Sequence, residues 1–213
     1  MPRALGLLLY SLRMRPGSIR AEGWAASVFE AQRRGEVSAR EARALIIDFV
    51  APSLDTTILA TTHLLWALSE NPEAWAQIRE DPSLIPAAVV ENVRLASPIR
   101  GFTRTLSRAH EIDGAELPEG ARVVLLFGAA NLDETQFPEP ERFDLRRPSP
   151  AHMGWGNGPH TCVGIHLAKL EMRSLLEAMV PRVGSISAGL PLRLRNNTLQ
   201  GIARMPATFA PAA

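Results

Sequence analysis

The stretch WGNGPHTCVG, residues 155–164, places the only cysteine of the chain, Cys162, in a glycine-rich loop. Gly156, Gly158 and Gly164 add no Cβ atoms, so the backbone can pass close to a flat ligand. Residues 163–180 are predicted to be helical, which places the sulfur near unpaired backbone N–H groups and the positive end of the helix dipole. Both features favour thiolate over thiol, and thiolate is the form that binds iron.

Three alternatives compete for this loop. A turn with a buried structural cysteine is the simplest, because free cysteine often behaves as a small apolar residue. A phosphate-binding G-x-G-x-x-G loop would need glycine where Thr161 stands, and no Lys-Ser or Lys-Thr pair follows for a P-loop. A zinc site could recruit nearby histidines, although the usual ligand spacing is absent. These histidines are His152, His160 and His166.

Composition limits the possible functions. The chain has 213 residues, 46% of them hydrophobic, which is enough for one sizeable core or a large piece of a bigger domain. Its 23 basic and 22 acidic residues nearly balance, so no global charge attracts nucleic acid or an anionic membrane. Arg43, Asp48 and Asp55 interrupt the longest apolar segment, so we expect no membrane span. A single cysteine excludes an internal disulfide and suits a reducing cytosol, which predicts a cytoplasmic protein.

Local signals predict a mainly α-helical chain with small β-sheets. Ser38 and Glu41 form a capping box that opens a long, mostly buried helix reaching about residue 68. Other helices are expected over residues 18–34, 71–82, 86–96 and 163–180. A β-rich run covers residues 122–127 and alternating residues fill 183–209, whereas residues 131–153 should wind irregularly over the surface. Asp113-Gly114 and Asn196-Asn197 are turn signals.

Inside the long helix, Asp55 and Thr56 stand among apolar residues. Burying a carboxylate there costs free energy unless the group is paired or solvated, which invites a functional explanation. Pro52 lacks a backbone N–H and is expected to kink the helix one turn before Thr56, opening a groove with a hydroxyl beside it. The alternative is that Thr56 bonds its own helix while Asp55 meets solvent or an arginine.

Glu91 and Arg94 lie three residues apart on one face of a predicted helix and can form a salt bridge. On an exposed helix such a pair contributes little to stability. The surrounding residues 87–95 are mostly apolar, which indicates that this pair is buried.

The cysteine loop resembles the signature of the cytochrome P450 family, F-G-x-G-x-H-x-C-x-G. Trp155 replaces the phenylalanine, and Lys169 stands where an arginine is commoner. Two other stretches resemble family motifs. PSLDT, residues 52–56, aligns with A/G-G-x-D/E-T, and Glu91 with Arg94 matches E-x-x-R. AANLD, residues 129–133, resembles A-N-R-D, and no chemistry is assigned to it.

The resemblance implies a heme b cofactor. Cys162 would be its axial ligand, and electron donation from that thiolate favours O–O cleavage. His160 would contact one heme propionate and Arg104 the other. Gly156 and Gly164 belong to the cofactor-binding positions of the loop.

Two further roles follow from the resemblance. Asp55 and Thr56 would relay protons toward bound oxygen. Glu91 and Arg94 would pair with an arginine of a P-x-R-F stretch, which Arg142 supplies in PERF, residues 140–143. This trio is expected to pin the irregular segment beneath the cysteine loop, a structural role.

Nearly the whole chain takes part in the resemblance. It implies the C-terminal portion of the cytochrome P450 fold, from the long distal helix to the C-terminal β-hairpin, so residues 1–213 would be the C-terminal half of one domain whose N-terminal half is absent. The implied activity is a monooxygenase that inserts one oxygen atom from O2 into a small to medium apolar substrate, with electrons from a ferredoxin or flavodoxin type donor. The alternative is a truncated, inactive fragment or a heme-binding module. Candidate substrate-lining positions are Leu54, Ile99, Phe102, Leu199 and Gln200.

Overall fold

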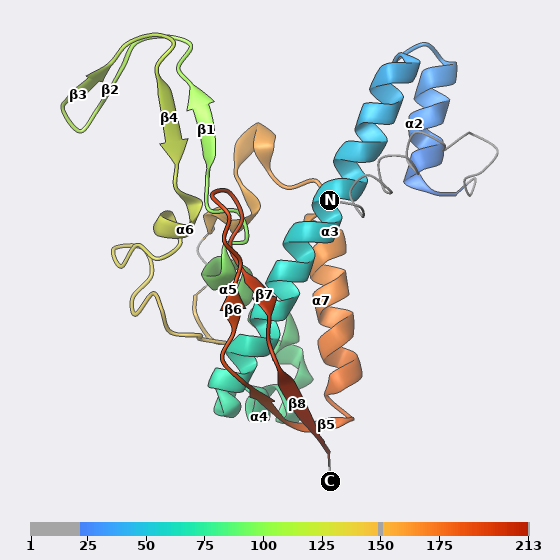
Figure 1. The fold of residues 1–213 in the computed structure, drawn as a ribbon, viewed down its shortest axis with the longest axis vertical. Coiled ribbons are helices and arrows are strands. Elements are labelled where there is room, and N and C mark those ends of the chain that lie inside the picture. Colours follow the sequence, from blue (N-terminus) through green and yellow to red (C-terminus); the bar gives the residue numbers. More distant parts are fainter. Residues whose placement is uncertain (1–21, 149–150, 213) are drawn as a thin grey trace. The chain divides into compact units, whose positions relative to one another are not determined.

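The computed structural model describes residues 22–148 and 151–212 (Figure 1). The chain divides into two compact units whose boundary falls between Asp55 and Thr56, inside the long helix α3 (Ala39–Glu70). The described residues are mainly helical with small antiparallel sheets, as predicted.

The first unit holds α2 (Trp24–Arg33) and the beginning of α3. α3 starts where the capping box predicts, because the Ser38 N–H donates to the Glu41 carboxylate at 2.7 Å and the Glu41 N–H donates to Ser38 Oγ at 3.2 Å. The rings of Trp24 and Phe49 lie with centroids 4.2 Å apart and join the two helices. The helix predicted over residues 18–34 is confirmed from Trp24 onward, and residues 18–21 lie outside the described part of the chain.

α3 is helical through Pro52, and the hydroxyl of Ser53 donates to the Val50 carbonyl at 2.8 Å. The expected kink at Pro52 stays a prediction. Of the helices described, α3 has the length and apolar composition to cross a membrane. That is weak evidence, because it rests on length and composition alone. Only 17% of the apolar window of α3 is buried, so the prediction of a mostly buried helix is wrong.

The second unit is organised around α5 (Ile85–Ala96) and α7 (Ile165–Met179), which pack side by side. The C-terminal part of α3 and helix α4 (Pro72–Glu80) contribute to the same core. Pro86 occupies the first turn of α5, where a backbone N–H has no intrahelical partner, as predicted. The fully buried side chains of this core include Leu64, Leu68, Ile78, Met172 and Leu176.

The strands of the second unit form two-stranded antiparallel sheets. The pairs are β1 (Phe102–Thr105) with β4 (Arg122–Leu125), β2 (His110–Ile112) with β3 (Ala115–Leu117), β5 (Val183–Ala188) with β8 (Ala207–Pro211), and β6 (Leu192–Arg193) with β7 (Ile202–Arg204). In Figure 1 the first two pairs continue into one long ribbon. Asp113 and Gly114 turn β2 into β3 with φ of 49° and 78°, which confirms the predicted turn.

Between β4 and α7 the chain forms the short helix α6 (Phe127–Ala130) and then follows turns and bends, as predicted. Two short 3₁₀ helices, Met153–Trp155 and Gly158–His160, carry the cysteine loop toward α7. α7 begins at Ile165, close to the predicted start at residue 163.

Candidate functional site

Cys162 is half-buried between the second 3₁₀ helix and α7. Its backbone N–H donates to the Trp155 carbonyl at 2.7 Å and so closes the loop, while the Ile165 N–H donates to the Cys162 carbonyl at 3.4 Å. The N-cap residue of α7 is Gly164, which has no side chain to cap the helix. The first turn of α7 therefore begins directly after the cysteine.

Two glycines shape the space around the sulfur. Gly156 has a φ of +69°, and a Cβ there would come within 2.6 Å of the His160 carbonyl oxygen, so a larger residue would force the loop to shift. At Gly164 an added Cβ would meet Cys162 Sγ at 3.9 Å, and no other described atom is recorded within 4 Å of it. The loop is thus tight along its backbone at Gly156, whereas a side chain at Gly164 would meet only the sulfur.

Arg104 and His160 are the residues predicted to bind propionates. Arg104 is half-buried on β1, and its guanidinium donates to the Thr103 carbonyl at 3.1 Å. Within residues 22–148 and 151–212 no carboxylate forms an ion pair with Arg104, so its charge is available to an anionic ligand. His160 is exposed, two positions before Cys162.

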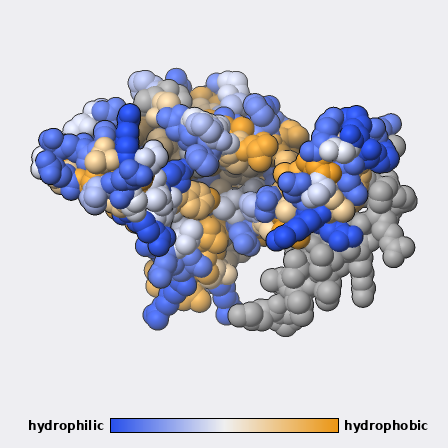
Figure 2. All heavy atoms as spheres, turned by 90° about the horizontal axis from the view of Figure 1, so that it is seen from above, coloured by the Kyte–Doolittle hydropathy of each residue, from blue (hydrophilic) through white to orange (hydrophobic). Residues whose placement is uncertain are grey.

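Apolar side chains near the start of α7 are unusually exposed. Val163 is 79% exposed and Leu170 is 57% exposed. Figure 2 shows apolar residues reaching the surface among polar ones on the face drawn. Such exposure suits a binding surface. A half-buried cysteine, a guanidinium without a described ion-pair partner and exposed apolar side chains are the kinds of group that a heme needs for its iron, its propionates and its ring.

The other interpretations of the cysteine loop receive less support. A structural cysteine would be fully buried, whereas Cys162 is not. Across the described parts of the chain, no three His, Cys, Asp or Glu side chains are grouped so as to hold a metal ion, which leaves the zinc alternative without its ligand set.

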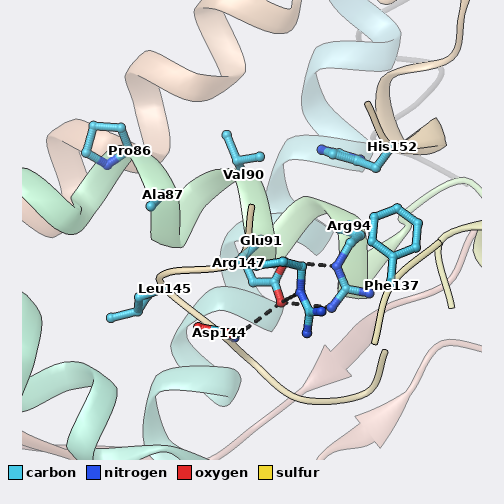
Figure 3. Close-up of a pocket in the computed structure, with 10 residues that line it drawn as sticks. All are labelled: Pro86, Ala87, Val90, Glu91, Arg94, Phe137, Asp144, Leu145, Arg147 and His152. Atoms are coloured by element: carbon cyan, nitrogen blue, oxygen red, sulfur yellow. Dashed lines mark hydrogen bonds and ion pairs between the residues drawn. The ribbon is translucent and has the colours of Figure 1, made fainter. Parts of the chain in front are cut away.

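A buried group of charges ties α5 to the segment that follows α6. Arg94 Nε and Nη2 donate to the Glu91 carboxylate at 2.9 and 2.8 Å, and Arg147 Nε donates to it at 2.9 Å (Figure 3). Burial acts to raise the pKa of Glu91, but the hydrogen bonds from Arg94 and Arg147 outweigh burial and hold that pKa below its ordinary value. We call Glu91, Arg94 and Arg147 the buried triad.

The third member of the triad is Arg147, so the prediction that Arg142 supplies the charge is wrong. The Arg142 side chain is 61% exposed and pairs with Glu139 at 3.0 Å. Only its carbonyl oxygen reaches the triad, accepting from Arg147 at 3.0 Å and from Arg94 at 3.4 Å. The backbone of residue 142, rather than its side chain, faces α5.

A pocket of about 220 Å³ lies beside the triad, and His152 forms part of its wall (Figure 3). His152 Nδ1 accepts the Gly154 N–H at 3.1 Å, so the neutral ring carries its proton on Nε2. Burial, followed by the positive charges of Arg94 and Lys169, lowers the pKa of His152 to about 4. None of the predicted heme-binding or substrate-lining residues lines this pocket.

The predicted proton-relay residues are neighbours on α3, and the boundary between the two units falls between them. Asp55 is exposed and Thr56 is half-buried. Leu54 is also exposed. The approach of these residues to Cys162 stays a prediction.

The remaining substrate-lining candidates all lie in the second unit. Ile99 and Leu199 face each other in an isolated antiparallel β-bridge. Phe102 packs edge-on against Phe127 with ring centroids 5.9 Å apart. Gln200 donates its side-chain amide to the Ala96 carbonyl at 2.9 Å, so this amide caps the end of α5. A substrate-lining role for these residues stays a prediction.

Sequence reasoning missed two residues that support the site. Arg147 could not be singled out because it follows Arg146 directly, and no local sequence signal indicates which of the two guanidinium groups is buried. Asn131 belongs to a stretch already singled out, but its four buried hydrogen bonds could not be foreseen.

The family model described as cytochrome P450 matches residues 18–183. The chain is 36% identical over 191 residues to cytochrome P450 CYP199A2 of Rhodopseudomonas palustris, covering 89% of this chain and 46% of that protein. It is 34% identical over 158 residues to linalool 8-monooxygenase of Pseudomonas putida, covering 74% of this chain and 39% of that protein. The chain spans less than half the length of these relatives.

Solved structures share the fold. CYP108D1 from Novosphingobium aromaticivorans matches with a TM-score of 0.81 and 31% identity, over 88% of this chain and 50% of that one. The tirandamycin C-bound monooxygenase TamI matches with a TM-score of 0.88 over 97% of this chain and 54% of that one, and at 23% identity it supports the fold alone. On the family match, these identities and the shared fold, the chain belongs to the cytochrome P450 family.

Proposed function

We propose that this chain carries the heme-binding part of a heme-thiolate monooxygenase, in which Cys162 would hold the iron of heme b through its sulfur. The observation that supports this most is a half-buried Cys162 at the N-terminus of α7, whose sulfur is what a side chain at Gly164 would meet. When bound, the heme supplies activation of O2, and electron donation from the thiolate favours O–O cleavage. Cys162 would hold the cofactor, and Gly156 and Gly164 would let the loop backbone approach it without a side chain in between.

Arg104 and His160 would orient the cofactor. Arg104, which has no ion-pair partner among the described residues, neutralises one propionate, and the exposed His160 donates to the other. The buried triad has its charges satisfied within the chain and therefore keeps the neighbouring segments rigid rather than touching the cofactor.

Asp55 and Thr56 move protons. The exposed Asp55 would exchange protons with water, and the Thr56 hydroxyl would pass them into the site. The balanced reaction joins R–H, O2, two electrons and two protons to give R–OH and water. The electrons come from a ferredoxin or flavodoxin type donor.

The substrate is a small to medium apolar molecule. The names of two relatives, linalool 8-monooxygenase and steroid C26-monooxygenase, are those of enzymes acting on largely hydrocarbon compounds. Oxygen insertion into such a molecule needs a pocket with few polar groups. The lining residues we propose are Leu54, Ile99, Phe102, Leu199 and Gln200.

The decisive experiment compares Cys162→Ser with His166→Gln. The chain is loaded with heme, reduced and exposed to carbon monoxide, and the strongly red-shifted Soret band of thiolate ligation is measured. We expect this band in the parent chain and in His166→Gln, and its loss in Cys162→Ser. A band that survives in Cys162→Ser contradicts the proposal. A parent chain that instead shows a Soret band without the strong red shift, altered only in His166→Gln, assigns the ligand to an imidazole.

A turnover assay distinguishes an active monooxygenase from an inactive heme-binding fragment. With a surrogate reductase, NADPH consumption and product formation from an apolar substrate are followed together. We expect Thr56→Ala to lower the product formed per NADPH more than it lowers NADPH consumption, because proton delivery is impaired. A thiolate spectrum without any product would favour the heme-binding module.

A further inference from the structure

Asn131 is fully buried, and its four hydrogen bonds join three segments of the second unit. It caps the C-terminal end of α6, where its N–H donates to the Phe127 carbonyl at 3.0 Å. Its carbonyl accepts from Arg94 Nη1 at 2.7 Å, so it contacts the buried triad directly. Each polar group of this residue, on backbone and side chain, has a partner within the chain.

The side-chain amide of Asn131 spans from α5 to the cysteine loop. Its Nδ2 donates to Ser97 Oγ at 2.8 Å, and its Oδ1 accepts the Met153 N–H at 2.6 Å. Ser97 ends α5 in the left-handed region, with φ of 36°, and its hydroxyl donates to the Arg94 carbonyl at 2.8 Å. The amide is therefore oriented by one helix end and in turn orients the start of the loop.

Met153 opens the 3₁₀ helix that leads to the cysteine. The next turn closes when the Gly156 N–H donates to the Met153 carbonyl at 3.0 Å, and Cys162 then bonds back to Trp155 at 2.7 Å. A Cβ at Gly154 would come within 3.0 Å of Val93 on α5, so the loop is tightly seated there. A shift at Met153 would thus be carried to Cys162 through a short chain of backbone bonds.

We propose that Asn131 is a positioning residue for the heme-ligating thiolate, acting through the Met153 N–H. This inference rests on the proposed heme-binding function. The claim that the Asn131 amide holds the loop in place can nevertheless be tested without heme. It also gives a role to the stretch AANLD, residues 129–133, which sequence analysis left without chemistry.

The chain offers a matched control in Asn92. It is also fully buried, and it bridges His63, at 2.8 Å, and the Ala60 carbonyl, at 2.9 Å. None of its recorded hydrogen bonds reaches residues 151–164. Asn131→Ala and Asn92→Ala remove the same side-chain atoms from equally buried sites, so both should lower the unfolding temperature, and only the first should loosen the loop.

Hydrogen exchange on the full chain without added heme tests whether the Asn131 amide holds the loop in place. In Asn131→Ala we expect the amides of Met153, Gly156 and Cys162 to exchange about tenfold faster than in Asn92→Ala, because a buried N–H has lost its acceptor. Equal exchange of these amides in the two variants overturns the inference, whatever the chain does with heme.

The conservative variant Asn131→Asp guards against a simple folding defect. It keeps an oxygen acceptor for the Met153 N–H at nearly the same position, so it should restore slow exchange of that amide even if its unfolding temperature falls. If Asn131→Asp exchanges as fast as Asn131→Ala, the bond to Met153 does not hold the loop and the inference fails.

The ferrous carbon monoxide spectrum then connects the loop to its ligand. We expect Asn131→Ala to bind heme with a smaller share of the thiolate-ligated band and a matching rise in the band of heme that lacks the thiolate. Asn92→Ala should keep the share of the parent chain. An unchanged share in Asn131→Ala overturns the proposed link to the thiolate. Absence of the band in the parent chain itself refutes the proposed function, while the exchange experiment still decides whether Asn131 holds the loop.

Discussion

Two regions of the second unit differ in whether their polar and apolar groups find partners within the chain. One is the buried triad, in which a carboxylate and two guanidinium groups are almost fully excluded from water and bonded to one another. The other, which we call the open face, comprises Cys162, Val163, Gly164 and Leu170 and leaves a sulfur and apolar side chains accessible.

The buried triad stabilises the fold through contacts within the chain, whereas the open face is suited to binding a ligand. Buried charges remain only where partners within the chain satisfy them, so the triad has one stable geometry. Exposed apolar groups beside an uncapped helix N-terminus gain little from the chain itself and gain much from an apolar ligand. Substitutions in the first region should change stability, and those in the second should change binding.

The largest effect is expected from Arg94→Leu. It leaves Glu91 with a single guanidinium partner and removes the donor to the Asn131 carbonyl, so the free energy of unfolding should fall by about 3–5 kcal/mol. Denaturant unfolding measures this. The control is Arg173→Leu, which breaks an exposed pair with Glu177 and should change stability by less than about 0.5 kcal/mol. Similar losses in the two variants would erase the distinction between buried and exposed pairs.

Arg147→Ala and Arg142→Ala sharpen the identity of the triad. Arg147 bonds Glu91 and the carbonyls of Pro138, Glu139 and Arg142, so its removal should cost about 2–3 kcal/mol. The exposed Arg142 side chain should cost less than about 0.5 kcal/mol. The reverse order in urea unfolding would restore the original assignment of Arg142.

The pH dependence of stability tests His152. The pKa of His152 falls from 6.5 to about 4 on folding. As pH falls, the unfolded chain therefore binds a proton at this residue before the folded chain does. The stability present above pH 6.5 is lost as pH falls toward 4. Between pH 7 and pH 5 this amounts to about 2 kcal/mol. His152→Asn keeps an acceptor for the Gly154 N–H and should flatten the profile by that amount.

The matched control for this profile is His110→Asn on the exposed strand β2, which should leave the profile as it is in the parent chain. A profile that His152→Asn does not flatten would mean that His152 is protonated in the folded chain at pH 5.

The smallest effect on stability is expected at the open face. Leu170→Gln replaces an exposed apolar side chain, and the free energy of unfolding should change by less than about 0.5 kcal/mol. Met172→Ala, two residues further along α7 and fully buried, should cost about 2–5 kcal/mol. Thermal unfolding of the chain without heme measures both. A large loss in Leu170→Gln would mean that the open face is part of the core.

The sequence alone determined the features that depend on neighbours a few residues apart. The start of α3 follows from the mutual bonds of Ser38 and Glu41, and the β2–β3 turn from the positive φ that Asp113 and Gly114 tolerate. The cysteine loop and the pairing of Glu91 with Arg94 were predictable for the same reason, since residues of one loop or one helix face meet whatever the rest of the chain does.

Only the tertiary structure decided which distant groups meet. Glu91 could have paired with any arginine of the later segment, and the path of residues 142–147 turned the backbone of Arg142 and the side chain of Arg147 toward α5. Asn131 acquired its role in the same way, because its partners Arg94, Ser97 and Met153 come from separate segments. Such contacts depend on how whole segments pack, and short-range propensity carries no information about that.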